Sequence, residues 1–419
     1  YVIGAVTALA RSHTPFWVRM PGAVLHGVTA LFLAALANRL AGRSAALWAA
    51  VLYISLPMVA VGSLLISTDT ILAPFFAAGM LFYHRLLSDH RKSDALLVGG
   101  MIGCACLAKY AGIYLPAGML LAALLRTDLR PRWSEIGIIA LPAVALVLPN
   151  LIWNFAHRWV TFSHTAQNIG WIEQSNPFAR VSLTTMVDFL ASQLAMVGPV
   201  VFAAILVGFW QFRRAPYLAA LSLPALMIVT GQSFLQDSNA NWAAASYFAG
   251  SVLAVGVLAN HRIWRAMGVA TNAIASLALP LLTLYPAFGF GHQPLLNRYL
   301  GRAEVSQKIV ALAHQEGLDT VVANNRDVLA DLFYTGRDSG LRVYTPRPTK
   351  APANFYEQIY PAPLDMTGPV LLISDRPPAC AALLVQRDLG AAAYCTRPMA
   401  AYNVPAQCAR DLPASAGCK

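Results

Sequence analysis

The stretch LLISTDTILAP, residues 64–74, places one carboxylate between two long apolar segments. Asp69 is the only acidic residue before Asp89. An ionised side chain at a membrane boundary is costly unless it faces water, a partner group or a substrate. Ser67 or Thr68 can cap a following helix, and Asp69 suits its first turn, at the positive end of the helix dipole. Two interpretations stay open: a plain helix start, or a carboxylate at the mouth of a cavity on the membrane surface.

The composition of the whole chain is that of an integral membrane protein with a soluble part attached. Of the 419 residues, 57% are hydrophobic and only 12% are charged, roughly half the charged fraction of soluble domains. The net charge of +11 comes from basic residues scattered through short loops, which favours topology signals and lipid contacts over nucleic-acid binding. The nucleotide-phosphate patterns GxGxxG and GxxxxGK[ST] and the zinc pattern HExxH do not occur.

Ten apolar runs follow an amphipathic beginning. Residues 1–22 are too short and too polar at their end to span a bilayer, and predict an interfacial segment with Phe16 and Trp17 at headgroup depth. Two later runs are shorter than the ~20 residues of a straight span. The expected spans are 23–38, 45–63, 70–87, 95–108, 111–125, 136–153, 186–210, 217–235, 242–259 and 265–290.

Basic residues divide between the loops in a way that predicts the topology. One set of alternate loops holds twelve Lys and Arg, the other only three, and cytoplasmic loops carry the excess. We therefore expect both ends of the chain to lie outside the cytoplasm, on the face that also collects the polar loops. The richer set is Arg39, Arg43, Arg85, Arg91, Lys92, Arg126, Arg130, Arg132, Arg213, Arg214, Arg262 and Arg265, and the poorer set is Lys109, Arg158 and Arg180.

From about residue 291 the chain changes character, because apolar runs shorten and charges become regular. Helical periodicity and short buried-strand runs alternate there, which predicts a small α/β domain over residues 291–419 outside the cytoplasm. The expected helices are 301–317, 326–336 and 378–390, and the expected strands are 319–324 and 369–374.

The cysteines also separate by region. Cys104 and Cys106 lie in an apolar span and are interpreted as packing residues. Four more fall in the outer domain without a CxxC spacing, which favours disulfides in an oxidising compartment over metal binding. Four cysteines allow three pairings, and at least one disulfide is expected. They are Cys380, Cys395, Cys408 and Cys418.

Two short corners on the predicted outer face carry candidate binding groups. Lys109-Tyr110 separates two apolar runs, so the lysine either snorkels to the headgroups or provides a fixed cation for a phosphate. Asp237, Asn239 and Asn241 precede another run, as ordinary turn residues or as part of a site.

The long loop 154–185 is the third candidate region. It holds His157, Arg158 and His164 among aromatic residues. Either this is an aromatic belt at the membrane interface, or its cations bind phosphate while its rings pack on sugar or lipid. With Glu173 the two histidines could also hold a divalent metal, although no tight ligand spacing supports one. The sequence identifies no certain cofactor.

Several segments, taken together, resemble the bacterial branch of glycosyltransferase family 39. This is the GT-C-fold group that includes protein O-mannosyltransferases and the aminoarabinose and galacturonic acid transferases of lipid A. The resemblance runs through almost the whole chain and rests on the order and spacing of its segments. The matching segments are TPFWVRMPGAVLHGVTALFLAALANRLAGRSAALWAAVLYISLPMV, STDTILAPFFAAGMLFY, CLAKYAGIYLPAGMLLAALL, PNLIWNFAHRWVTFSHTAQNIG, ANWAAASYFAG and LNRYLG.

The resemblance implies a polytopic GT-C-type domain over residues 1–290 in a bacterial inner membrane. It implies transfer of a sugar from a polyprenyl-phosphate donor to a lipid or protein acceptor at the periplasmic face. Asp69 matches the family's second acidic residue, and the primary acidic pair would lie before Tyr1. Lys109 matches a basic residue suited to the carrier phosphate. Other matches are Arg19 in the Arg19-Met20-Pro21 run and, less closely, His157 or His164 near the donor headgroup.

Two other functions compete with this one. A transporter or flippase of lipid-linked sugars would show internal repeats and broken helices at mid-membrane, and no repeat is found in the sequence. A non-catalytic scaffold or sensor would act through the outer α/β domain. The clustering of polar groups at one face favours the enzyme.

Overall fold

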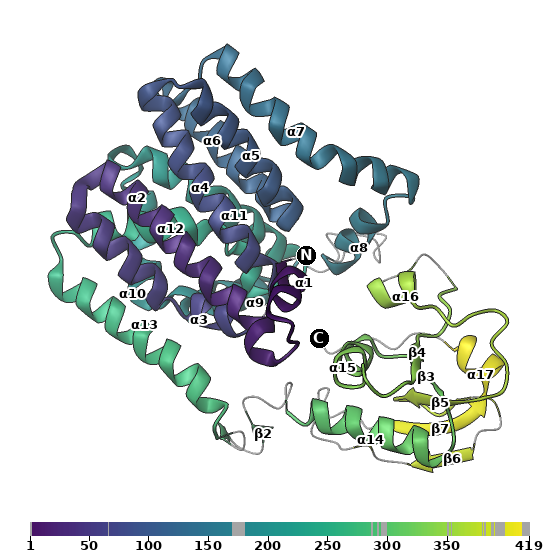
Figure 1. Cartoon of the computed structure of the whole chain (residues 1–419). Helices are drawn as coiled ribbons and strands as arrows, with labels where there is room; N and C mark the ends of the chain where they lie inside the picture. Colours follow the sequence, from purple (N-terminus) through teal and green to yellow (C-terminus); the bar gives the residue numbers. More distant parts are fainter. Residues whose placement is uncertain are drawn as a thin grey trace. The chain divides into compact units, whose positions relative to one another are not determined.

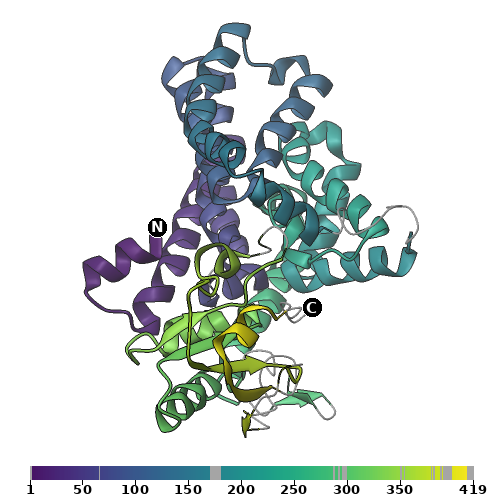
Figure 2. The same ribbon diagram turned by 90° about the vertical axis from the view of Figure 1, so that its right-hand side faces the viewer.

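The computed structural model divides the chain into two compact units, Tyr1–Pro280 and Leu281–Lys419. The division falls shortly before the domain boundary expected after residue 290. Figures 1 and 2 show the whole chain in two views, and each unit is described here by itself. The structure describes residues 2–412 apart from 66, 170–180, 286–287, 291–292, 295–299, 350–351, 353, 379, 381–382, 387–388 and 390–398.

Helices form almost all of the first unit (Figure 1). Among the described residues, five helices are long and apolar enough to cross a membrane, α2, α4, α7, α11 and α13, and the bent pair α9–α10 would make six. The ten expected spans stay a prediction, because the remaining apolar helices are shorter. The elements are α1 (Val2–Ala10), α2 (Pro15–Ser55), α3 (Pro57–Leu64), α4 (Thr68–Asp89), α5 (Lys92–Ala108), η1 (Tyr110–Ile113), α6 (Tyr114–Leu125), η2 (Thr127–Leu129), α7 (Trp133–Ala156), α8 (Val160–Asn168), α9 (Leu183–Val197), α10 (Pro199–Trp210), η4 (Phe212–Arg214), α11 (Pro216–Leu235), η5 (Ala240–Ala243), α12 (Ser246–Val257) and α13 (Arg262–Leu282).

Two expectations for this unit are wrong. Residues 15–22 do not form a separate interfacial segment but begin α2, which starts with Pro15 at its first position and is interrupted at Ala41 and Gly42. The run 186–210 is not one straight span, since α9 and α10 meet at 113°. Gly198 between them has φ +79° and is followed by Pro199. Gly-Pro is a turn signal that the apolarity of the run concealed.

Helix α4 lies in the middle of the packing and carries the site at its start. It packs against α2 and α5. Of its apolar 18-residue stretch, 67% is buried, compared with 6% of the corresponding stretch of α7. Large side chains are almost fully buried here, namely Phe76 and Tyr83 of α4 itself, Tyr53 of α2 and Phe248 of α12. In Figure 1, α7 and α13 lie at the margins of the bundle, where apolar side chains can face lipid.

The second unit is built on a five-stranded mixed sheet, coloured green to yellow in Figure 1. The strand order is β4-β3-β5-β7-β6, in which β3 is parallel to β4 and β5, and β7 is antiparallel to β5 and β6. The elements are β1 (Gly289–Phe290), β2 (Gln293–Pro294), α14 (Arg302–Gln315), β3 (Thr320–Ala323), α15 (Arg326–Thr335), β4 (Arg342–Tyr344), α16 (Phe355–Ile359), β5 (Pro369–Ser374), β6 (Leu383–Gln386), β7 (Ala400–Pro405) and α17 (Ala406–Arg410).

Alternate residues of the strands bury two separate apolar clusters, one on each face of the sheet. Val321 and Leu371 pack with α14 and α15, whereas Val322 and Leu372 pack with α17. Successive side chains of a strand point to opposite faces, so the continuous apolar runs of β3 and β5 supply both clusters. This confirms the two expected strands and the helices at 301–317 and 326–336.

The helix expected over residues 378–390 is wrong. Residues Leu383–Gln386 form strand β6, which pairs with β7 in the register Leu383↔Asn403 and Leu384↔Tyr402. A short apolar run does not distinguish a buried helix from a strand. Here the segment forms a strand because the backbone N–H and C=O groups at the edge of β7 need hydrogen-bond partners.

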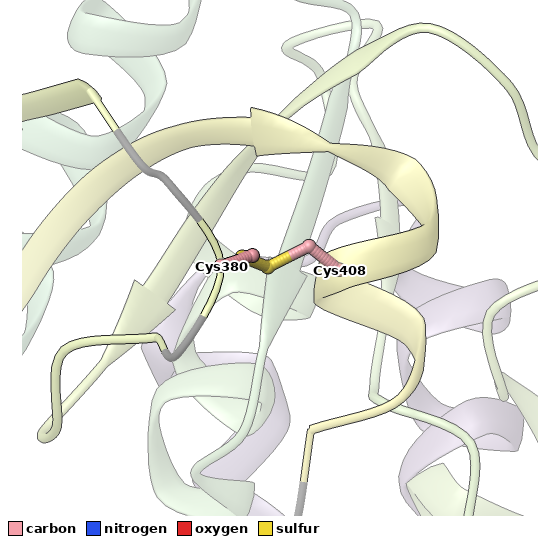
Figure 3. Close-up of a disulfide and its surroundings, with 2 residues drawn as sticks. All are labelled: Cys380 and Cys408. Carbon is pink, nitrogen blue, oxygen red and sulfur yellow. A yellow bond between two sulfur atoms is a disulfide. The ribbon is translucent and has the colours of Figure 1, made fainter.

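A disulfide joins Cys380 to Cys408, with their Cα atoms 6.2 Å apart (Figure 3). It links the segment before β6 to α17. It is one of the pairings that the sequence left open, and Cys395 and Cys418 lie outside the described residues. Cys104 and Cys106 are free and partly buried in α5.

We expect the double substitution Cys380→Ala/Cys408→Ala to lower the unfolding free energy of the second unit by about 3 kcal/mol, since it removes the constraint on the unfolded segment between the two residues. Denaturant unfolding followed by a probe in this unit measures it. Reductant should lower wild-type stability to the level of the variant and leave the variant unchanged. A wild type that is insensitive to reductant would contradict the prediction.

Candidate functional site

The 64–74 stretch contains the start of α4. Ser67 is the N-cap of α4, and its Oγ accepts a hydrogen bond of 3.0 Å from the backbone N–H of Asp69. The helix-start interpretation is therefore confirmed. The cap is Ser67, however, which leaves the carboxylate of Asp69 available for other groups.

Three side chains from different parts of the chain donate hydrogen bonds to that carboxylate. Lys109 Nζ lies 2.6 Å from Asp69 Oδ1. Asn241 Nδ2 donates to Oδ2 at 2.8 Å, and Ser67 Oγ donates to the same oxygen at 3.2 Å. The side chains of Asp69 and Lys109 are only 15% and 22% exposed, so the ion pair is less screened than one on an open surface. We call Ser67, Asp69, Lys109 and Asn241 the Asp69 cluster.

The lysine reaches the cluster because of the tight corner between α5 and α6. Lys109 is extended, with φ −161°, and ends α5, after which η1 turns the chain into α6. The backbone N–H of Gly112 donates to the carbonyl of Lys109 at 2.8 Å. A Cβ at Gly112 would collide with the backbone of Ala105 and Cys106 in α5. The close contact at Gly112 thus fixes where Lys109 leaves the helix.

We expect Gly112→Ala to displace this corner and to lower the sugar transfer that the family resemblance implies by at least tenfold, because the new methyl group meets backbone and not a flexible side chain. Gly100→Ala is the matched control, since a Cβ at Gly100 on α5 meets nothing within 4 Å. Transfer rates in membranes with matched expression measure both. Equal activity of the two variants would show that the corner tolerates the shift.

Tyr110, the residue after Lys109, contacts α8. Its hydroxyl is 2.7 Å from Thr161 Oγ1, and its ring stacks on Phe162 with centroids 4.9 Å apart. Asn154 at the end of α7 accepts hydrogen bonds from the backbone and the hydroxyl of Thr161. Tyr110 and Phe162 are more than one-third exposed. An aromatic surface therefore adjoins the Asp69 cluster along the chain, and sugar rings commonly pack on such surfaces.

Arg19 lines a hollow beside the start of α4. The hollow has about 320 Å³ of empty space, part of it open to solvent, and its lining is mostly apolar. Ser67 and Thr70 contribute to its wall, together with Gly22 and Gly62. The structure thus brings Arg19 near the N-terminus of α4 without an ion pair to Asp69 among the described residues.

Known proteins resemble this chain in both sequence and structure. Residues 1–153 match the family described as dolichyl-phosphate-mannose-protein mannosyltransferase. The chain is 37% identical over 397 residues to the lipid A galacturonosyltransferase RgtD of Rhizobium johnstonii, covering 91% of this chain and 81% of that protein. The chain belongs to glycosyltransferase family 39. It is therefore a membrane glycosyltransferase, and the transporter and scaffold interpretations give way to the enzyme.

The fold agrees with this family assignment. The structure of ArnT from Cupriavidus metallidurans in the apo state matches 97% of this chain and 87% of its own, with TM-score 0.62 and 15% sequence identity. The same protein bound to undecaprenyl phosphate matches with TM-score 0.58, also at 15% identity, over 96% of this chain and 86% of its own. At such identity the likeness shows the GT-C fold alone, which confirms the expected polytopic helical class.

The structure does not connect the other loop candidates of this family 39 enzyme to the Asp69 cluster. His157 turns back on α7, where its Nδ1 lies 2.7 Å from the carbonyl of Trp153 and its ring stacks on Trp153 at 4.1 Å. Arg158 and Trp159 have positive φ values of 55° and 57° and make the turn into α8. His164 lies within α8, but its side chain, like Glu173, is outside the described part of the chain.

No metal centre is visible in the part of the chain that the structure describes, where no three His, Cys, Asp or Glu side chains lie close enough to hold an ion. The expected metal ligands His164 and Glu173 fall outside that part. Sequence reasoning missed one group that the structure places beneath the cluster, the buried His26 of α2. A histidine inside an apolar span was the available signal.

Proposed function

We propose that this enzyme transfers galacturonic acid from a polyprenyl-phosphate donor to a lipid A-type acceptor at the periplasmic face of the inner membrane. Support for the acceptor and the sugar comes from the name of its relative, a lipid A galacturonosyltransferase. Support for the donor comes from the Asp69 cluster, because a fixed lysine ammonium pairs well with phosphate oxygens. This cation, held at a corner between two apolar helices, is the single observation that carries the proposal.

The transfer reaction needs a cation for the departing phosphate more than it needs a nucleotide-binding site. The acceptor hydroxyl attacks C1 of the sugar, the C1–O bond to the phosphate breaks, and its electron pair remains on the polyprenyl phosphate. Lys109 stabilises the charge that develops there. The hydroxyl proton requires a carboxylate base. Asp69 has the role of holding Lys109 and Asn241 in place.

In this scheme the Asp69–Lys109 ion pair describes the enzyme before donor binding. The ammonium of Lys109 has three donors and uses one on Asp69 Oδ1. The others can contact a phosphate without breaking the pair. Asp69 then reduces the cost of keeping a partly buried cation in the empty site, and it directs the free N–H groups of Lys109 toward the donor.

The direct test uses the purified chain in detergent with polyprenyl-phosphate galacturonic acid and lipid A. Sugar incorporated into the lipid, measured by mass spectrometry, is the expected result. An aminoarabinose donor and a protein acceptor are the comparison arms, and a chelator arm tests the divalent metal that the sequence left open. Transfer from another donor, or to protein but not lipid A, would replace the proposed substrates. No transfer in any arm, together with no binding of the polyprenyl-phosphate donor to the chain, would contradict the proposed donor class.

The periplasmic location gives a separate prediction. Because alternate loops differ so strongly in basic residues, a reporter fused after Gly291 should be active as a periplasmic alkaline phosphatase and inactive as a cytoplasmic β-galactosidase. A fusion in the Arg126–Arg132 loop should behave in the opposite way. Cytoplasmic activity at residue 291 would overturn the topology and the outward-facing site together.

A further inference from the structure

A buried histidine lies directly behind the Asp69 cluster. His26, on the first half of α2, is only 3% exposed. Its Nδ1 is 2.9 Å from the hydroxyl of Tyr53 on the second half of α2, and its Nε2 is 3.3 Å from Thr70 Oγ1. Thr70 is the next residue after Asp69, in the first turn of α4. The imidazole thus bridges two distant segments, and one of them carries the carboxylate.

Thr70 has a second hydrogen-bond partner, and this contact fixes which atom donates in each hydrogen bond around His26. Its hydroxyl donates to the carbonyl of Gly62 in α3 at 3.0 Å. A hydroxyl has one proton to give, so His26 Nε2 supplies the proton of the contact with Thr70, and Nδ1 accepts from the hydroxyl of Tyr53. Both ring nitrogens are then satisfied in a neutral imidazole, as a buried polar group requires.

The fit around the ring is close. A Cβ at Gly62 would approach His26 Nε2 to 2.6 Å and Thr70 Oγ1 to 3.0 Å. Four segments therefore meet at the ring: the two halves of α2, which is interrupted at Ala41 and Gly42, the end of α3 and the start of α4. Apart from its cap, the first turn of a helix has no intrahelical acceptors for its N–H groups. Side-chain contacts such as those of Thr70 therefore decide the direction of the first turn of α4.

We propose that His26 is a positioning residue for sugar transfer. Through Thr70 it fixes the first turn of α4, and it thereby sets the direction from which the Asp69 carboxylate meets Lys109 and Asn241. Only the kinetic arm of its test depends on the substrates proposed above. A misplacement of about 1 Å in a reacting or orienting group lowers rates roughly a hundredfold, which is the scale of effect that loss of this support allows.

The kinetic arm compares variants of the full chain in detergent. We expect His26→Leu and Thr70→Val to lower kcat about ten- to hundredfold with a much smaller change in KM for the donor. Thr70→Ser should retain activity because it keeps the hydroxyl, and His26→Gln should exceed His26→Leu because its amide offers a donor and an acceptor. The double variant His26→Leu/Thr70→Val should lose little more than either single variant.

The structural arm needs no substrate. A carbodiimide joins a carboxylate to an amine only at contact distance, so it should cross-link Asp69 to Lys109 in the wild type, with the product read by mass spectrometry. His26→Leu should reduce the yield several-fold. The matched control is Ser55→Ala, which removes a buried hydroxyl of α2. In the part of the chain that the structure describes, this hydroxyl donates to the carbonyl of Leu52 within its own helix.

Each result decides the question. Lower cross-linking and lower kcat in His26→Leu, with wild-type behaviour in Ser55→Ala, support the positioning role. Unchanged cross-linking in a folded His26→Leu protein overturns it, even if the donor proves to be a different one. Equal losses in His26→Leu and Ser55→Ala that follow their melting temperatures assign His26 to general packing and also overturn it. If the wild type transfers no sugar, the cross-linking arm alone gives the answer.

Discussion

Lys109→Ala is expected to lower kcat/KM for sugar transfer about ten- to hundredfold, which corresponds to the loss of a charge-assisted contact of ~1.5–3 kcal/mol. The variant removes the cation for the departing phosphate. Among the described residues, it leaves the carboxylate of Asp69 with Asn241 and Ser67 as donors. Transfer from the polyprenyl-phosphate donor in membranes, at matched expression, measures the effect.

The same helix provides the control. Lys92 begins α5, at the end opposite Lys109, and Lys92→Ala should leave transfer unchanged. Lys109→Arg should retain part of the activity, because its charge remains while its planar donors fit the space of an ammonium poorly. Full activity in Lys109→Ala would return this lysine to the snorkelling interpretation.

Asp69→Asn is expected to lower transfer at least tenfold while the protein still folds. The amide keeps the shape of the carboxylate, but its NH₂ group would face the Lys109 ammonium or the NH₂ group of Asn241, since donors already occupy both oxygens. The ion pair is lost, and the cation is no longer held. Transfer rate and melting temperature, measured on the same preparations, separate activity from folding.

Ser67→Ala separates capping from chemistry. Ser67 is the cap of α4, so its loss should cost about 1 kcal/mol of stability with a smaller effect on transfer than Asp69→Asn. If Asp69 served only as a helix-start residue, Asn would replace it without loss. Wild-type transfer by Asp69→Asn would therefore remove the residue from the site.

The sequence predicted much of the site because its signals are local. The sequence predicts a helix cap at Ser67 or Thr68, and the structure selects Ser67. The sequence also marks Asp69 as a costly charge at a membrane boundary. Lys109 was recognised as a cation that interrupts an apolar run. Nothing in the sequence showed that Lys109 contacts Asp69 directly, or that His157 turns away to pack on Trp153. Contacts of that kind depend on how the helices cross and not on their composition.

Apolar runs and their period predicted by themselves most of the helices of the first unit and its place in a membrane, since burial in lipid requires satisfied backbone groups within each segment. They likewise determined strands β3 and β5, whose every residue but Pro369 is buried. Tertiary structure decided the rest. Strand β6 exists because β7 offers an edge, and Asn241 reaches Asp69 across 172 residues. Such pairings depend on the packing of segments far apart in the chain, which no local pattern specifies.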